Sequence, residues 1–149
     1  MFRYRAWAGL KGAYPNTFKK GIIFMKNILY AASECGPFVK TGGLGSVMAS
    51  LPGEVNKEEY DVRLVLPDYE CIPQEYKEKM ETLLSFPVQL NWRHTYATVK
   101  ELKMDGMTFY FLSHPDYFQG EEPYGEIWMD IEKYCFFCKA VVDMLSWLE

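Results

Sequence analysis

The sequence has no long apolar run. Its longest candidates, residues 21–24 and 140–148, fall short of the roughly 18 uninterrupted apolar residues of a membrane-spanning helix, so we expect no membrane span. Histidine is scarce, with two residues, and no cluster of metal-ligand residue types stands out, so we expect neither a metal nor another cofactor. Low-complexity sequence and repeats are also missing, and the content of 49% hydrophobic and 24% charged residues is typical of a globular domain.

A disulfide framework is absent as well. The four cysteines are scattered and no secretory signal precedes them, which favours reduced thiols in a cytoplasmic protein. Cys135 and Cys138 form a C-x-x-C motif without a second pair to complete a zinc site. Because they lie in an apolar helical pattern, we expect buried structural thiols, and metal or redox chemistry remains the alternative.

Acidic residues are missing from residues 1–24, which contain five basic residues. The rest of the chain therefore carries 11 basic against 20 acidic residues, and an acidic body of this kind is not expected to bind nucleic acid. Residues 1–24 have neither the apolar core of a signal peptide nor the serine content of an organellar presequence. We expect them to be an N-terminal extension outside the fold, with the folded domain at residues 25–149.

The first half of the body has the pattern of a βαβ unit. Residues 27–32 and 61–67 are short apolar runs of the kind that form buried parallel strands. Between them lie a glycine-rich loop, residues 40–45, and a helical spacing of Val47, Met48, Leu51 and Val55. The crossover of such a unit builds a parallel sheet, so the fold class is predicted to be α/β.

The second half predicts a β-hairpin insertion and a closing helix. Residues 86–90, 95–102 and 107–112 have strand patterns, and Asp105-Gly106 between the last two is a strong hairpin-turn signal. Residues 74–84 are compatible with a helix. Residues 131–147 predict a helix with apolar residues on most faces, which we expect to be largely buried. The two histidines, His94 and His114, are expected at strand ends on the surface.

The loop from Lys40 to Gly45 predicts an anion-binding turn. Glycines between a strand and a helix let backbone N–H groups approach an anion, and the helix that follows adds the positive end of its dipole. A lysine beside the loop can add its charge. The spacing matches neither the dinucleotide fingerprint nor a P-loop, so a plain tight turn remains open on spacing alone.

The residues around this loop carry a resemblance. The residues that carry the resemblance are Ala32-Ser33-Glu34, Pro37-Phe38, Lys40-Thr41-Gly42-Gly43-Leu44-Gly45, Leu51-Pro52 and residues 61–67. This region resembles the N-terminal part of the ADP-glucose-type bacterial glycogen synthases and plant starch synthases. Downstream, Tyr117-Phe118, Pro123-Tyr124-Gly125 and residues 132–137 are similar to the tyrosine-glycine loop and helix of the same family. The resemblance extends over the whole of residues 25–149.

The resemblance implies a GT-B glycosyltransferase, with two Rossmann-like domains around a cleft that transfers glucose from ADP-glucose to the non-reducing end of an α-1,4-glucan. Lys40, Gly42 and Gly43 match the residues that contact the sugar nucleotide and its diphosphate, and Tyr124 matches a tyrosine of the substrate cleft. No catalytic residue of the family falls within this chain. Residues 25–149 would then be an incomplete N-terminal Rossmann-like domain, without the second GT-B domain, and we expect the chain alone to be inactive.

Several positions depart from the family pattern. Ser46 stands where an aspartate is usual, Lys133 replaces an arginine, Glu59 replaces a glycine and Tyr60 a histidine, and Met129-Asp130 stands where the family has Asp-Asn. Ser46 cannot supply a carboxylate, and Lys133 keeps the charge but loses bidentate geometry. Two other interpretations remain. The chain could be a stand-alone module that binds α-glucan or a partner through its aromatic residues, which make up 17% of the sequence. Another GT-B transferase, such as a sucrose synthase, fits the glycine loop less well.

Overall fold

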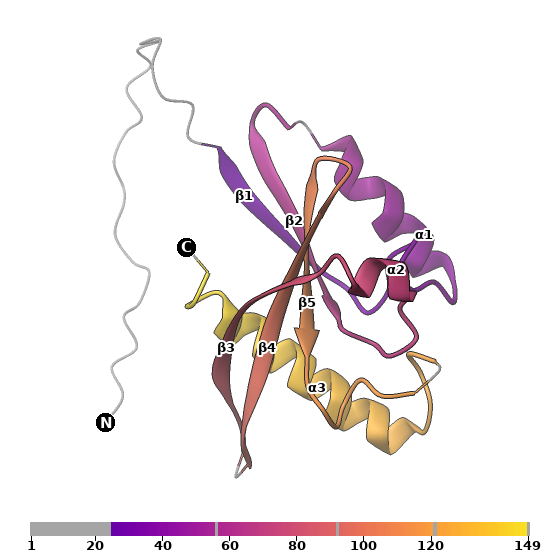
Figure 1. Cartoon of the computed structure of the whole chain (residues 1–149), viewed down its shortest axis with the longest axis vertical. Helices are drawn as coiled ribbons and strands as arrows, with labels where there is room; N and C mark the ends of the chain where they lie inside the picture. Colours follow the sequence, from indigo (N-terminus) through magenta and orange to yellow (C-terminus); the bar gives the residue numbers. More distant parts are fainter. Residues whose placement is uncertain (1–24, 56, 92, 121, 149) are drawn as a thin grey trace, which may run out of the picture.

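The computed structural model describes residues 25–55, 57–91, 93–120 and 122–148. The expected extension at residues 1–24 lies outside the described residues. The elements follow in the order β1 (Lys26–Ala31), α1 (Gly43–Ser50), a 3₁₀ turn η1 (Leu51–Glu54), β2 (Tyr60–Pro67), α2 (Gln74–Lys77), β3 (Glu81–Leu90), β4 (Arg93–Met104), β5 (Met107–Ser113) and α3 (Ile127–Met144) (Figure 1).

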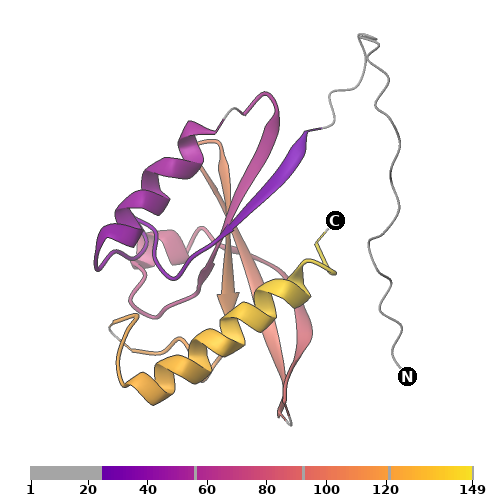
Figure 2. The same cartoon turned by 180° about the vertical axis from the view of Figure 1, so that it is seen from behind.

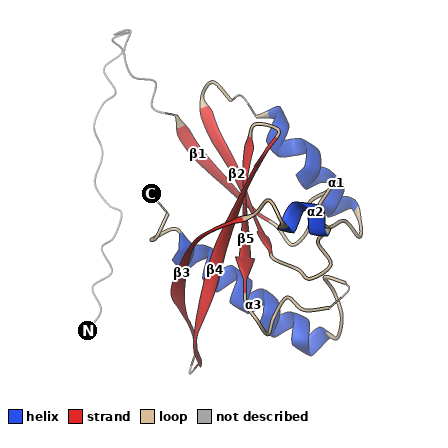
Figure 3. Ribbon diagram, in the orientation of Figure 1, coloured by secondary structure: helices blue, strands red, loops and turns tan. Residues whose placement is uncertain are grey.

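The strands form one mixed sheet in the order β1-β2-β5-β4-β3 (Figure 3). β1, β2 and β5 are parallel, whereas β4 pairs antiparallel with both β5 and β3. The α/β prediction and the hairpin insertion are therefore confirmed, and the hairpin strands extend the same sheet. Asp105 and Gly106 both have positive φ, of 52° and 71°, as the predicted two-residue hairpin turn requires.

Helices cover both faces of the sheet. α3 crosses one face, and α2 lies on the other, as the two opposite views show (Figures 1 and 2). On the α2 face, the ring of Phe38 packs edge-on against Phe109 and Phe111 of β5 and Tyr76 of α2. On the α3 face, Phe136 packs against Phe118. The described residues thus share an aromatic core on either side of the central strands.

Two helices are shorter than predicted, one because of strand pairing and the other because of a proline. The predicted helix at residues 74–84 ends in α2 at Lys77, and the chain enters β3 at Glu81 because that segment pairs with β4. The helix after the glycine loop also stops earlier than its apolar spacing predicts. α1 ends at Ser50 and the 3₁₀ turn follows from Leu51, because Pro52 in the first turn lacks the N–H that a continuing α-helix needs.

The closing helix is buried on one side only, so the prediction of burial on most faces was wrong. α3 runs from Ile127 to Met144 and buries four residues toward the sheet: Phe136, Phe137, Ala140 and Met144. Large apolar side chains on its other sides and just beyond its end are exposed: Ile127, Trp128, Met129, Ile131, Val142, Leu145 and Trp147. Cys135 and Cys138 are likewise exposed, which corrects their prediction as buried thiols.

His114 is buried rather than on the surface as predicted, whereas His94 is exposed. The Nδ1 atom of His114 accepts a hydrogen bond from the backbone N–H of Asp116 at 3.1 Å. The neutral ring therefore carries its proton on Nε2 and donates it to the Thr95 hydroxyl at 2.7 Å. Burial lowers the pKa of His114 below its usual value. The histidine is a neutral part of the packing around Phe136, whose ring lies 4.7 Å away.

Asp68 carries a buried charge just beyond the end of β2. Its side chain is 5% exposed and its Oδ2 atom accepts a hydrogen bond from Lys100 of β4 at 2.6 Å. The other carboxylate oxygen, Oδ1, is buried without a hydrogen-bond partner. The lysine thus compensates a charge that has few other contacts within the described fold.

Candidate functional site

The glycine loop lies where β1 ends and α1 begins, and one carboxylate organises it. The Oε2 atom of Glu34 accepts hydrogen bonds from the backbone N–H groups of Thr41 at 2.7 Å and Gly42 at 3.1 Å. The Oε1 atom accepts from the hydroxyl groups of Thr41 and Tyr124, both at 2.7 Å. Four donors therefore converge on a single buried side chain.

Glu34 is 3% exposed, and its charge is stabilised by these donors. Burial alone would raise the pKa of the carboxyl group. The hydrogen bonds from Tyr124, Thr41 and Gly42 outweigh burial and lower the pKa to about 2. Glu34 is consequently ionised throughout the physiological range and keeps its four donors in place.

Tyr124 is brought to the glycine loop by the segment that precedes α3. Because its hydroxyl donates to Glu34, it accepts from the hydroxyl of Ser33 at 2.8 Å. A hydrogen-bond chain thus runs from Ser33 through Tyr124 to Glu34. Burial, together with the charge of Glu34, raises the pKa of Tyr124. The sequence interpretation placed Tyr124 in a substrate cleft, and the structure brings it against the loop that was expected to contact the nucleotide.

The backbone on both sides of Tyr124 is held by α3. Lys133 donates to the carbonyl of Pro123 at 2.6 Å, and Asp130 accepts from the N–H of Gly125 at 2.9 Å. Lys133 and Asp130 also form an ion pair of 2.6 Å. The lysine that departs from the family pattern therefore makes one contact with a carbonyl and one with a carboxylate oxygen, and neither needs a bidentate guanidinium group.

Two further tyrosines complete the support of this segment. The hydroxyl of Tyr134 donates to the carbonyl of Pro123 at 2.8 Å and accepts from the hydroxyl of buried Tyr69 at 2.9 Å. Burial raises the pKa of Tyr69, and it raises the pKa of Tyr134 to about 12. Both phenols thus remain protonated donors, and the position of Tyr124 is fixed from the core outward.

Lys40, Gly42 and Gly43 form the open side of the loop, and all three are exposed. α1 begins at Gly43 without a side-chain cap on its first N–H groups. A Cβ atom built on Gly42 or Gly43 would meet nothing within 4 Å. The described fold therefore does not itself require a glycine at either position, and the space beside them is available to a ligand.

Gly45 differs from these two glycines because the fold itself requires it. A Cβ atom at this buried position would lie 3.0 Å from the Cα, Cβ and Cγ atoms of Lys40. The carbonyl of Gly45 also accepts a hydrogen bond from the N–H of Gly36 at 3.0 Å. The close approach fixes where the Lys40 side chain leaves the backbone. Ser46, at the position of the usual aspartate, is exposed on α1.

A cavity of about 610 Å³ adjoins Tyr124 on the side away from the glycine loop. Its lining includes Tyr117, Arg93 and Glu132, which are linked to one another by hydrogen bonds and an ion pair. In the described ranges, no group of three or more His, Cys, Asp or Glu side chains could hold a metal ion. No helix in these ranges has the length and hydropathy of a membrane-crossing segment.

Glu34 is the residue that sequence reasoning missed. It stands in the motif Ala32-Ser33-Glu34, which contributes to the family resemblance, but the sequence alone assigned no role to its carboxylate. Its position directly after β1 was the available signal, because side chains there point toward the loops at the carboxyl edge of a parallel sheet.

The fold resembles a solved structure titled "Catalytic domain of Starch Synthase IV from Arabidopsis thaliana bound to ADP and acarbose". The TM-score is 0.70 at 23% identity, over 81% of this chain and 25% of the other. This similarity supports the expected architecture, part of a GT-B catalytic domain.

Curated glycogen synthases are closer in sequence. The enzyme of Lachnospira eligens is 50% identical over 121 residues, covering 81% of this chain and 25% of that protein. The enzyme of Lachnoclostridium phytofermentans is 46% identical over 125 residues, covering 84% of this chain and 26% of that protein. The chain thus spans about a quarter of the length of these relatives. Residues 27–149 match the family described as starch synthase catalytic domain, and the chain belongs to that family.

Proposed function

We propose that residues 25–149 supply the donor-facing part of a glycogen synthase, which transfers glucose from ADP-glucose to the non-reducing end of an α-1,4-glucan. The observation that carries the proposal is the open side of the glycine loop. There, exposed Lys40 stands beside Gly42 and Gly43, whose missing side chains leave space that the fold does not use. A cytoplasmic enzyme of this kind would need no metal at a site where the protein itself supplies positive charge.

The chemistry of the loop suits a departing nucleoside diphosphate. When the bond from glucose to the diphosphate breaks, negative charge builds up on the phosphate oxygens. The uncapped N–H groups at the start of α1 and the ammonium group of Lys40 would stabilise that charge. A related starch synthase is described with ADP and acarbose bound, which supports a nucleotide and a glucan as the two substrates.

We also propose that the chain alone does not catalyse glucose transfer. The second GT-B domain would contribute the other side of the cleft. The donor and acceptor would meet only in the complete enzyme, so activity must be tested there.

A hybrid enzyme tests the proposal directly. Residues 25–149 would replace the matching segment of the Lachnospira eligens glycogen synthase, and incorporation of radiolabelled glucose from ADP-glucose into glycogen would be measured. We expect an active hybrid. Lys40→Ala should lower kcat/KM for ADP-glucose about 100-fold or more, the loss typical of one removed charge-stabilising group. Lys103→Ala, at an exposed lysine of β4, is the matched control. A folded hybrid without activity, or a fully active Lys40→Ala variant, would refute the assignment.

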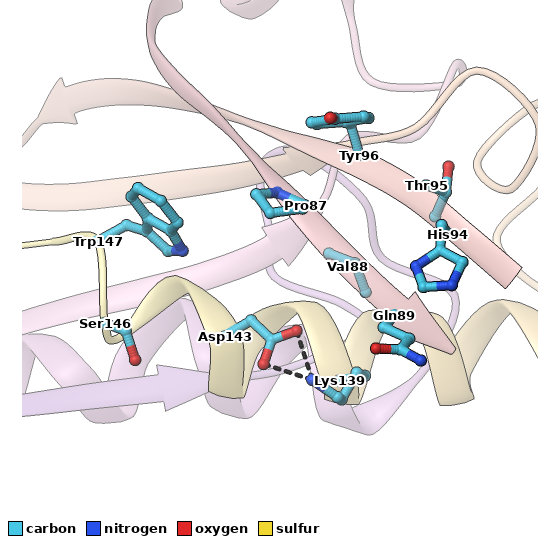
Figure 4. Close-up of a pocket in the computed structure, with 10 residues that line it drawn as sticks. All are labelled: Pro87, Val88, Gln89, His94, Thr95, Tyr96, Lys139, Asp143, Ser146 and Trp147. Carbon is cyan, nitrogen blue, oxygen red and sulfur yellow. Dashed lines mark hydrogen bonds and ion pairs between the residues drawn. The ribbon is translucent and has the colours of Figure 1, made fainter. Parts of the chain in front are cut away.

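The second candidate function is binding of α-glucan without catalysis, and a surface pocket favours it. The pocket, of about 430 Å³, lies between the β3–β4 hairpin and the end of α3. Trp147, 53% exposed, stands at one end and His94 at the other, with the Lys139–Asp143 ion pair below the hairpin strand (Figure 4). Exposed rings beside hydrogen-bonding side chains are suited to a sugar chain.

Affinity electrophoresis in gels that contain glycogen separates this candidate from the first. A glucan-binding module should be retarded, and Trp147→Ala should abolish the retardation. Trp128→Ala is the control, because Trp128 is 79% exposed on α3 but does not line this pocket. Equal migration with and without glycogen would rule out the second function.

A further inference from the structure

We infer that Glu34 is the positioning residue of the glycine loop, and that the Tyr124 hydroxyl makes this position depend on the segment before α3. The inference rests on the proposed donor-binding role of the loop. Glu34 itself would not touch the ligand, because its carboxylate is buried and its four hydrogen bonds are made within the chain.

The carboxylate divides the N–H groups of the loop into two sets. Those of Thr41 and Gly42 point inward to Glu34. Those at the start of α1, from Gly43 onward, have no side-chain cap and remain available to a ligand on the exposed side. The buried Glu34 carboxylate therefore holds the loop in the shape in which the N–H groups at the start of α1 can bind the anionic ligand. Such preorganisation lowers the ordering cost of binding.

The link to Tyr124 extends this arrangement beyond the loop. Ser33 donates to Tyr124 and Tyr124 donates to Glu34, so two neighbouring residues just beyond β1 contact one phenol. That phenol is in turn held by the contacts of Pro123 and Gly125 with α3. A change in the segment before α3 would therefore affect the glycine loop through the hydroxyl group of Tyr124.

The sign of one measurement distinguishes positioning from simple electrostatics. Glu34 is a negative charge close to the loop, so by Coulomb's law its removal should strengthen the binding of an anion. If Glu34 positions the loop, its removal should weaken that binding. Glu34→Ala thus gives opposite results under the two explanations.

The experiment uses the full 149-residue chain, with ADP as the probe. Backbone N–H exchange at Thr41 and Gly42 would be followed by NMR, together with ADP-dependent shifts of the Gly43 and Leu44 amides. In Glu34→Ala we expect exchange at Thr41 and Gly42 to accelerate about 10- to 100-fold, as for lost hydrogen bonds to a charged group. We expect ADP affinity to fall about tenfold or more for the same reason. Exchange in the core strand β5 should not change.

Three further variants complete the design. Tyr124→Phe removes only the hydroxyl group that links Tyr124 to Glu34. It should accelerate exchange at Thr41 and Gly42 roughly tenfold and weaken ADP binding less than Glu34→Ala does. Glu34→Gln should retain part of the protection, because its amide oxygen can still accept from the two N–H groups while the hydroxyls of Thr41 and Tyr124 rotate to accept from its NH₂ group. Glu75→Ala removes the same charge from exposed α2 and should leave both readouts unchanged.

The outcomes are decisive in either direction. Unchanged exchange at Thr41 and Gly42 in Glu34→Ala, or tighter ADP binding by this variant, overturns the positioning role. Failure of the wild-type chain to shift with ADP counts against the proposed donor site. In that case the exchange rates alone still decide whether Glu34 holds the loop.

Discussion

Replacing Gly45 by alanine should destabilise the chain, whereas the same change at Gly43 should not. At Gly45 the new methyl group would lie 3.0 Å from three carbon atoms of Lys40, including its Cα, so backbone would have to move. Overpacking of this kind costs about 1–3 kcal/mol. At Gly43 the methyl group would enter open space, and alanine should stabilise the helix by about 0.5–1 kcal/mol.

The comparison of the two variants isolates the steric effect. Both residues lie in α1, so the gain in helix propensity is similar and largely cancels. The free energy of unfolding, from urea titration followed by circular dichroism, should therefore be about 1–3 kcal/mol lower for Gly45→Ala than for Gly43→Ala. Equal stabilities would mean that Lys40 and Gly45 are not in tight contact, and the account of the loop would be wrong.

Three other changes test the packing around the site. Acidification should lower the free energy of unfolding as the pH falls through about 6.5, the pKa of an unfolded histidine. The reason is that burial lowers the pKa of His114 in the folded state, so the unfolded chain binds the proton more readily. A pH series of urea titrations measures this loss, and His114→Gln should remove it. Tyr69→Phe should cost about 0.5–1.5 kcal/mol, since the Tyr134 hydroxyl loses its donor; an unchanged melting temperature would contradict that hydrogen bond. Lys100→Met should lower the free energy of unfolding by about 3–5 kcal/mol, because it leaves Asp68 buried and uncompensated. The decrease should be smaller in the double variant that also carries Asp68→Asn, and a double-mutant cycle of urea titrations measures the difference.

The βαβ unit and the hairpin could be predicted because their signals are local. The Asp105-Gly106 turn needs only two residues with positive φ, and the apolar run of β2 is buried as predicted. β1 pairs parallel with β2 as expected, but the prediction that it is buried was wrong, because it is the edge strand and none of its residues is buried. Residues 74–84 were misjudged because strand pairing with β4, a non-local interaction, decides their conformation. His114 was misjudged for a similar reason, since its partners Thr95 and Asp116 are met only in the folded chain.

The site was predictable in its parts but not in its assembly. Lys40, Gly42 and Gly43 could be named as candidates from the sequence because a strand-glycine-helix order has a known electrostatic use, and their contact with a nucleotide stays a prediction. Tyr124 could be identified only through the family resemblance. Its meeting with Glu34 joins residues 90 positions apart, and no local pattern indicates such a contact. The one-sided burial of α3 was unpredictable too, because an apolar helix face reveals nothing about which neighbour covers it.

The strand order has a consequence for the path of folding. β3, β4 and β5 are joined by tight turns and pair with their neighbours in sequence, so they can form a meander while little chain entropy is lost. β2 must then find β5 across the whole intervening hairpin, and β1 can join only after β2 is in place. The glycine loop follows β1, so its final shape would be acquired late, on a platform that the antiparallel strands have already built.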